Sequence, residues 1–210
     1  MTARYLATLK MPALPQRSRS STHLMARMTL LKERPDSLAH LQLAATFIRA
    51  VEFAVLTYRL AKSGLTALAR DRSFNGWCDG ISALETCLTE CHRAIRFATV
   101  LSRAGLRMPD GTPLVPRSAR SGILSRRTAS RIARLRNTQQ HLDERILSGD
   151  LGAAQAFGPR PESTGLSLGR MSVQYCELAA WLSELDALAA RVQYITRCRP
   201  TRNTSDESSI

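Results

Sequence analysis

The sequence predicts an all-α protein, a helical bundle of about four long helices, with a short β-hairpin before the last of them. Hydrophobic residues make up 44% of its 210 residues but aromatic residues only 5%, and such Ala- and Leu-rich composition favours helices over a β-sandwich. Apolar residues also recur at alternating steps of three and four, which is the spacing of one helix face. At this length we expect one buried core.

The two ends of the chain are predicted to lie outside the bundle. The first 32 residues contain no acidic residue, and Pro12, Pro15 and a serine-rich run argue against early order. We therefore expect residues 1–35 to be a flexible basic arm that resembles a transit peptide, unless the chain starts at Met25 or Met28. The bundle is predicted over residues 36–198, and a disordered polar tail over residues 199–210.

Four segments carry the helical repeat. The first is predicted over 37–70, after Pro35, and the second between Gly76 and Gly105, followed by a connector at 105–116. The third is predicted over 117–147, and the last covers about 178–195. The apolar positions are Leu41, Ala44, Ile48, Val51, Val55 and Tyr58 in the first; Leu84, Leu88, Cys91, Ile95 and Ala98 in the second; Ile132, Leu135, Leu142 and Ile146 in the third; Leu178, Trp181, Leu185, Leu188, Val192 and Ile195 in the last.

A short hairpin is predicted between the third and last helices. Leu166, Leu168, Met171 and Val173 alternate around Gly169-Arg170. Alternation with a period of two is typical of strands, and a glycine in a two-residue loop favours a tight turn.

The charge favours a polyanionic partner. The chain has 30 basic and 17 acidic residues, a formal net charge of +13, and basic surface attracts nucleic acid by steering and counterion release. An arginine-rich composition can equally reflect the nucleotide composition of the source genome. No stretch approaches the roughly 20 apolar residues of a membrane span, and no signal peptide is evident. We expect a cytoplasmic protein with no membrane partner.

The cysteines give little support for a metal site. There are five, and none forms a C-x-x-C pair. Cys87 and Cys91 can share a helix face beside His92, but two further ligands are missing. Small buried thiols in a reducing compartment are the simpler interpretation. We therefore expect no metal. We also expect no cofactor, because the sequence lacks a glycine-rich phosphate loop.

One polar cluster late in the third helix has the composition of a catalytic site. On a continuous helix, Asn137 and His141 lie one turn apart and opposite the apolar face, with Arg136 on the flank. A histidine titrates near neutrality and can move a proton to or from an RNA hydroxyl. An arginine can bind the phosphate and offset transition-state charge without a metal. The alternative is a solvated polar face in which His141 pairs with Glu144 or Asn137.

The run Arg136-Asn137-Thr138-Gln139-Gln140-His141 resembles the Arg-x4-His signature of HEPN domains. The resemblance implies a helical bundle, a homodimer, and a composite, metal-independent endoribonuclease site of the kind found in toxin, phage-defence and RNA-processing systems. It makes Arg136 the phosphate contact, His141 the catalytic or RNA-binding imidazole and Asn137 the supporting polar group. Asp143 stands where toxin members continue with tyrosine, so regulation by modification of that residue is not implied.

An arginine series precedes this motif. It contains no acidic residue and could guide an RNA backbone toward the site, although it could also be a hydrated helix face. The candidate RNA-binding residues are Arg126, Arg127, Arg131 and Arg134. The function expected is thus an RNA-binding protein or ribonuclease, with RNA, a second copy and an antitoxin-like protein as partners. The alternative is a non-catalytic interaction protein whose basic surface binds nucleic acid or a protein.

Overall fold

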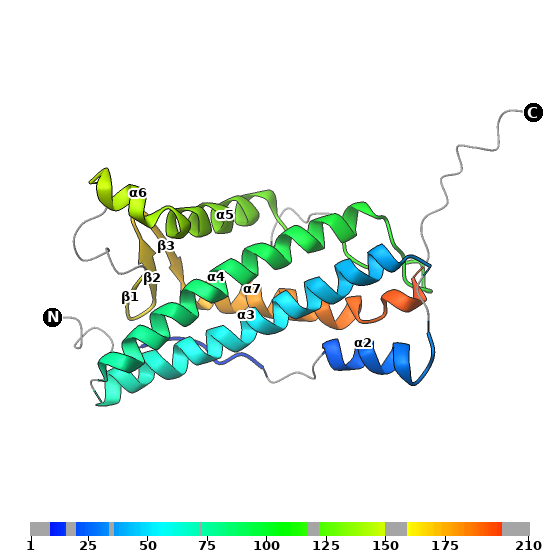
Figure 1. The fold of residues 1–210 in the computed structure, drawn as a ribbon, viewed down its shortest axis with the longest axis horizontal. Coiled ribbons are helices and arrows are strands. Elements are labelled where there is room, and N and C mark those ends of the chain that lie inside the picture. The colour runs from blue at the N-terminus through cyan, green and yellow to red at the C-terminus, as the bar shows by residue number, and fades with distance from the viewer. Residues whose placement is uncertain are drawn as a thin grey trace, which may run out of the picture.

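The computed structural model describes residues 9–15, 20–33, 36–71, 73–116, 122–149 and 159–198. These residues are mostly helical, as predicted, with a small antiparallel sheet before the last helix (Figure 1). The described helices are α2 (Ser20–Thr29), α3 (Leu38–Asp71), α4 (Phe74–Arg103), α5 (Arg126–Gln140), α6 (Leu142–Leu147), α7 (Tyr175–Val192) and the 3-10 turn η2 (Ile195–Arg197). The strands are β1 (Arg160–Pro161), β2 (Gly165–Leu168) and β3 (Met171–Gln174).

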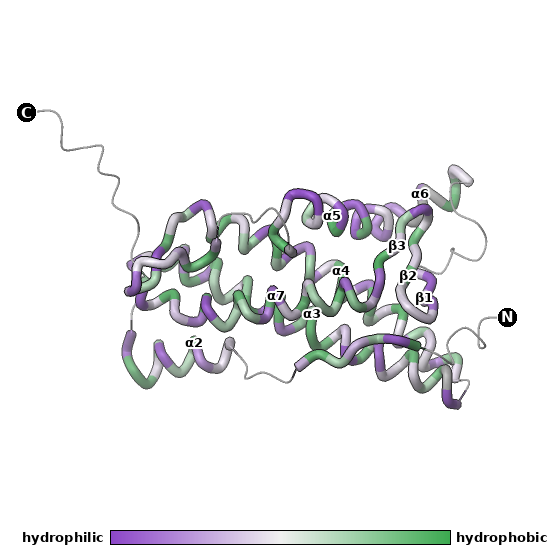
Figure 2. The backbone as a smooth tube through the Cα atoms, turned by 180° about the vertical axis from the view of Figure 1, so that it is seen from behind, coloured by the Kyte–Doolittle hydropathy of each residue, from purple (hydrophilic) through white to green (hydrophobic). Residues whose placement is uncertain are grey.

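Helices α3 and α4 form a long antiparallel hairpin at the centre of the molecule (Figure 1 and Figure 2). Ser73 begins α4 by accepting a hydrogen bond from the Gly76 amide at 3.2 Å. The two backbones approach very closely near this end, because a Cβ built on Gly64 would lie 2.6 Å from the Gly76 carbonyl oxygen. The apolar faces predicted for both helices are buried in the core, except that Val55 is half-buried.

The predicted hairpin is present, and β1 extends it to three strands in the order β1-β2-β3. Leu166 pairs with Val173, and Leu168 with Met171. Gly169 has a φ of +60°, the conformation that the first turn position of a type II′ hairpin requires. The buried side chains of Leu166, Leu168 and Val173 join the core beside α7. The predicted apolar face of the last helix is buried from Leu178 to Val192 in α7, and Ile195, also buried, lies in η2 instead.

The N-terminal segment differs from the flexible arm expected from its composition. Residues 9–15 lie against the core, where Met11 is buried and Pro12 accepts a hydrogen bond from the Tyr58 hydroxyl at 3.1 Å. Helix α2 packs along α3, and Ser21 donates from its amide and hydroxyl to the Glu52 carboxylate at 2.9 and 2.6 Å. These tertiary contacts offset the low local propensity for order. The predicted polar tail, residues 199–210, lies outside the described residues.

Helix α3 also has a membrane-like composition. Among the described helices, α3 alone is long and apolar enough to cross a membrane by length and composition, over Leu38–Leu68 with a mean hydropathy of 1.3. The expectation that no stretch is apolar enough for a span is therefore not met. Its inner face is buried against α4 and α7, which accounts for part of this hydropathy, and 39% of the most apolar window is buried.

The carboxylate of Glu33 joins the end of α2 to η2 near the C-terminal end of the described residues. Glu33, just after α2, accepts hydrogen bonds from the Thr196 hydroxyl at 2.6 Å, from Arg197 at 2.8 and 3.0 Å, and from Arg27 at 3.1 and 3.2 Å. The Arg27 guanidinium also stacks over the Tyr194 ring, 4.2 Å from its centroid. These hydrogen bonds, led by that from Thr196, lower the pKa of Glu33 from 4.5 to about 2.

Acid is therefore expected to destabilise the protein partly through Glu33. Because the folded-state pKa is depressed, this contribution is complete above pH 4.5 and is lost as the pH falls toward about 2. The variant Glu33→Gln should lose on the order of 1–3 kcal/mol above that range, as for hydrogen bonds to a charged group. The measurement is urea unfolding of both proteins over a pH series. A stability difference that does not shrink on acidification would contradict this role.

Candidate functional site

The helix that carries the predicted site is shorter than expected and is broken within the motif. Ser125 begins α5 by accepting a hydrogen bond from the Thr128 amide at 3.2 Å. At His141, with φ −105° and ψ 34°, the backbone leaves the helical region, and α6 begins at the next residue. The single helix predicted over 117–147 is therefore wrong, although residues 117–121 lie outside the described residues.

The break changes the apolar face of the third helix. Ile132 and Leu135 are fully buried, but Ile146 is 43% exposed and Leu147 is 88% exposed. Helix α6 packs mainly on the end of α5, whereas α5 itself lies against α4 and β2. The α6 residues whose burial the structure describes, Glu144, Ile146 and Leu147, are all exposed and add nothing to the core.

His141 lies in an open groove between the end of α5 and the β2–β3 turn, here called the α5–hairpin groove. The groove has a volume of about 660 Å³. His141 is exposed, and its Nδ1 lies 3.3 Å from Oε2 of the exposed Glu144. Asn137 contributes from one turn earlier and Arg170 from the hairpin, and the full lining is Arg134, Asn137, Thr138, His141, Glu144, Gly169, Arg170 and Met171.

Arg136 does not line this groove. Its Nη1 donates to Oδ1 of Asn137 at 3.2 Å, and its Nε is buried without a hydrogen-bond partner among the described residues. Arg136 also affects His92 on α4. Burial lowers the pKa of His92 most, and the positive charges of Arg136 and Arg96 lower it further. Within one copy, the structure therefore brings Asn137 to both Arg136 and the groove of His141, but shows no bond between Arg136 and His141 among the described residues.

The four candidate RNA-binding arginines divide into two kinds. Arg126, Arg127 and Arg134 are exposed, and no described residue pairs with them. Arg131 is instead held by protein groups. It forms an ion pair with Glu177 of α7, donates to the Ser172 carbonyl oxygen of β3 at 2.5 Å, and lies over the Trp181 ring, 5.6 Å from its centroid.

These contacts make Arg131 a structural residue. It ties α5 to both β3 and α7, and so fixes the hairpin, with Arg170 at its turn, opposite α5. Arg170 is the groove residue that the sequence interpretation missed. The signal available was its position: it lies in the predicted two-residue turn, where a long side chain projects from the sheet end.

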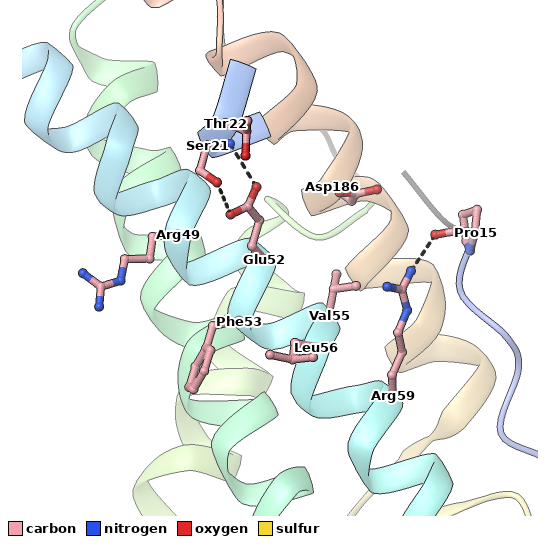
Figure 3. Close-up of a pocket in the computed structure, with 10 residues that line it drawn as sticks. All are labelled: Pro15, Ser21, Thr22, Arg49, Glu52, Phe53, Val55, Leu56, Arg59 and Asp186. Atoms are coloured by element: carbon pink, nitrogen blue, oxygen red, sulfur yellow. Dashed lines mark hydrogen bonds between the residues drawn. The ribbon is translucent and has the colours of Figure 1, made fainter. Parts of the chain in front are cut away.

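A second cavity, of about 350 Å³, lies between the N-terminal segment and α3 (Figure 3). Figure 3 shows the Glu52 carboxylate held by Ser21, and the Arg59 guanidinium donating to the Pro15 carbonyl oxygen, at 2.9 Å. Beside this cavity, α3 presents an exposed apolar stripe with helical spacing. Its members Phe53, Leu56 and Leu60 are 47%, 47% and 53% exposed.

The cysteines do not form a cluster with other metal-binding residues. Cys87 and Cys91 are fully buried on one face of α4, and all five thiols are free. Within the part of the chain that the structure describes, no three His, Cys, Asp or Glu residues lie together as metal ligands would. A side-chain hydrogen bond with Cys87, and then burial, raise the pKa of the Cys91 thiol, so it stays protonated.

Comparison with protein-family models, with curated proteins and with solved structures finds no match to this chain. The chemistry of the site is therefore argued from its own residues.

Proposed function

We propose that this protein is a HEPN-like RNA-binding protein and that RNA lies along the exposed face of α5 and in the α5–hairpin groove. One observation carries the proposal. Arg127, Arg134, Asn137 and His141 follow one another along this face, and Arg170 joins them from the β2–β3 turn. The arginines can hold phosphates, and the amide and imidazole can contact sugar or base.

The charge of α5 favours the binding of a polyanion. The helix contains no acidic residue, and the carboxylate that lines the groove, Glu144, is itself close to His141. Arginine contacts to phosphate release counterions, so the affinity should fall steeply with salt. No Phe, Tyr or Trp is among the described residues that line the groove, which argues for backbone contacts over extensive base stacking.

We further propose that two copies together cleave RNA without a metal. His141 is exposed in the groove and free to meet a substrate or a second subunit, which supports this step. Within one copy Arg136 is bound to Asn137, so the phosphate contact next to His141 would be Arg136 of the other copy, or Arg134 and Arg170 of the same copy. An antitoxin-like partner and a cytoplasmic location belong to the same proposal.

A specific observation also favours the alternative, a non-catalytic interaction protein. Phe53, Leu56 and Leu60 form a contiguous exposed apolar stripe on α3. Contiguous apolar patches, unlike apolar residues scattered singly over a surface, are typical of protein interfaces. A protein of this class would bind a partner through α3 and would lack cleavage activity. The two functions are distinguished by RNA assays.

RNA binding is tested by removing the two groove arginines. The double variant Arg134→Ala/Arg170→Ala should bind a fluorescent single-stranded RNA more weakly, and its salt slope should fall by about 1.4, or about 0.7 per lost phosphate contact. The matched control is Arg49→Ala/Lys62→Ala, which removes the same charge from α3. Fluorescence anisotropy over a salt series gives both quantities. Equal losses in the two double variants, or no binding by the wild type, would contradict the proposal.

A further inference from the structure

A second basic groove lies on the other flank of α5. It is formed between the C-terminal part of α4 and the N-terminal part of α5 and has a volume of about 610 Å³. Its charged residues are Arg103 and Arg126, both exposed, and no described residue pairs with either. No carboxylate is among the described residues that line it. The lining residues are Thr99, Ser102, Arg103, Pro116, Leu124, Arg126 and Ala129.

The two hydroxyls of this groove are already used as donors. Thr99 donates to the Ile95 carbonyl oxygen at 2.8 Å, and Ser102 to the Pro116 carbonyl oxygen at 3.2 Å. The donors left for a ligand are therefore the two guanidinium groups. A planar guanidinium with no carboxylate partner is suited to the oxygens of a phosphate group.

The exposed ridge of α5 connects this groove with the α5–hairpin groove. Arg127, Ser130 and Arg134 are exposed and lie at steps of three and four, so they share one face of the helix. From Arg126 to Arg134 the helix rises by about 12 Å, at about 1.5 Å per residue. Figure 1 shows α5 lying along α4 with the hairpin near its far end.

Several arginines elsewhere on the molecule pair with carboxylates, whereas others, such as Arg49 and Arg96, have no such partner among the described residues. Arg27 and Arg197 bind Glu33, Arg131 binds Glu177, and Arg70 binds Asp71. Unpaired arginines gather around α5: Arg103, Arg126, Arg127, Arg134 and Arg170 lie in or between its two grooves, and none has a carboxylate partner among the described residues.

From this arrangement we infer a second phosphodiester-binding subsite at Arg103 and Arg126. A single-stranded RNA bound in the α5–hairpin groove would cross over α5, and its continuation would bind at this subsite. The inference rests on the proposed RNA binding and adds a direction to it. RNA would run obliquely over the ridge, with Arg127 and Arg134 between the two grooves. A short oligonucleotide would occupy the α5–hairpin groove alone, and a longer one would occupy both grooves.

The test uses the full chain and two labelled oligouridines, of about 4 and about 16 nucleotides, the range of site sizes of single-strand-binding modules. The variant Arg103→Ala/Arg126→Ala should bind the long RNA more weakly, with a salt slope smaller by about 1.4. The short RNA should bind it as it binds the wild type, because the α5–hairpin groove is intact. Circular dichroism and the melting temperature confirm that the variant is folded.

The panel of variants separates the two proposals. Unchanged affinity and salt slope for the long RNA in Arg103→Ala/Arg126→Ala, with a loss in Arg134→Ala/Arg170→Ala, would overturn the second subsite alone. A loss of the same size in Arg49→Ala/Lys62→Ala would also overturn it, because net charge would then explain the effect. If the wild type binds neither RNA, the proposed function and the second subsite both fail.

Discussion

Replacement of His141 by alanine is expected to reduce metal-independent RNA cleavage by about 10²- to 10⁴-fold, the usual contribution of a general acid or base. His141 is the exposed imidazole of the α5–hairpin groove, next to Asn137 and Glu144. Its substitution removes no buried contact, so the fold should be unaffected. The measurement is cleavage of a labelled RNA in EDTA over a range of protein concentrations.

Arg136→Ala should reduce the same cleavage, because a composite site needs the guanidinium of Arg136 on the phosphate. Gln140→Ala, at the exposed neighbour of His141, is the matched control and should cleave as the wild type does. Activity that survives in either the His141 or the Arg136 variant would contradict the composite site. A wild type that binds RNA in EDTA but does not cleave it would leave RNA binding as the function and remove the ribonuclease step.

The substitution Gly64→Val is expected to destabilise the protein by about 2–3 kcal/mol or more, as overpacking of a tight contact does. A Cβ at residue 64 would meet the Gly76 carbonyl oxygen at 2.6 Å and the Gly80 amide nitrogen at 3.0 Å. Both are backbone atoms of α4, so they cannot rotate away and the two helices must separate. At this chain length, each 1 kcal/mol corresponds to a fall in Tm of roughly 2–4 °C.

The matched control for Gly64 is Ser63→Val, which places the same β-branched side chain at the exposed neighbouring position of α3. Valine has a helix propensity close to that of serine and higher than that of glycine, so propensity alone would favour Gly64→Val. A lower melting temperature of Gly64→Val than of Ser63→Val therefore reports the contact with α4. Urea unfolding supplies the free energies. If the two variants melt together, the close approach of α3 and α4 does not contribute to stability.

The secondary structure of the bundle follows from local patterns. The apolar repeats of α3, α4 and α7 place the same residues in the core that the structure buries, since each side chain's burial follows from its helical phase. The β2–β3 hairpin also follows, because Gly169 supplies the positive φ of its turn. The sequence also predicted that His141 faces away from the core, and it is exposed.

Other features depend on contacts between distant residues. The order of residues 9–15 and 20–33 depends on partners such as Tyr58 and Glu52 on α3. Arg131 differs from its exposed neighbours because Glu177 and Ser172, over 40 positions away, hold it. Arg170 enters the groove because the hairpin folds back beside α5.

Local sequence patterns are sufficient to predict the class of fold, the buried faces of α3, α4 and α7 and the basic, acid-free character of α5. These properties are local, because propensity and hydrophobic period act over neighbouring residues. Only the tertiary structure decided that the helix breaks at His141, that Arg136 and His141 have separate surroundings in one copy, and that grooves flank α5 on both sides. Those features are set by which surfaces are available for packing, and that depends on the whole chain.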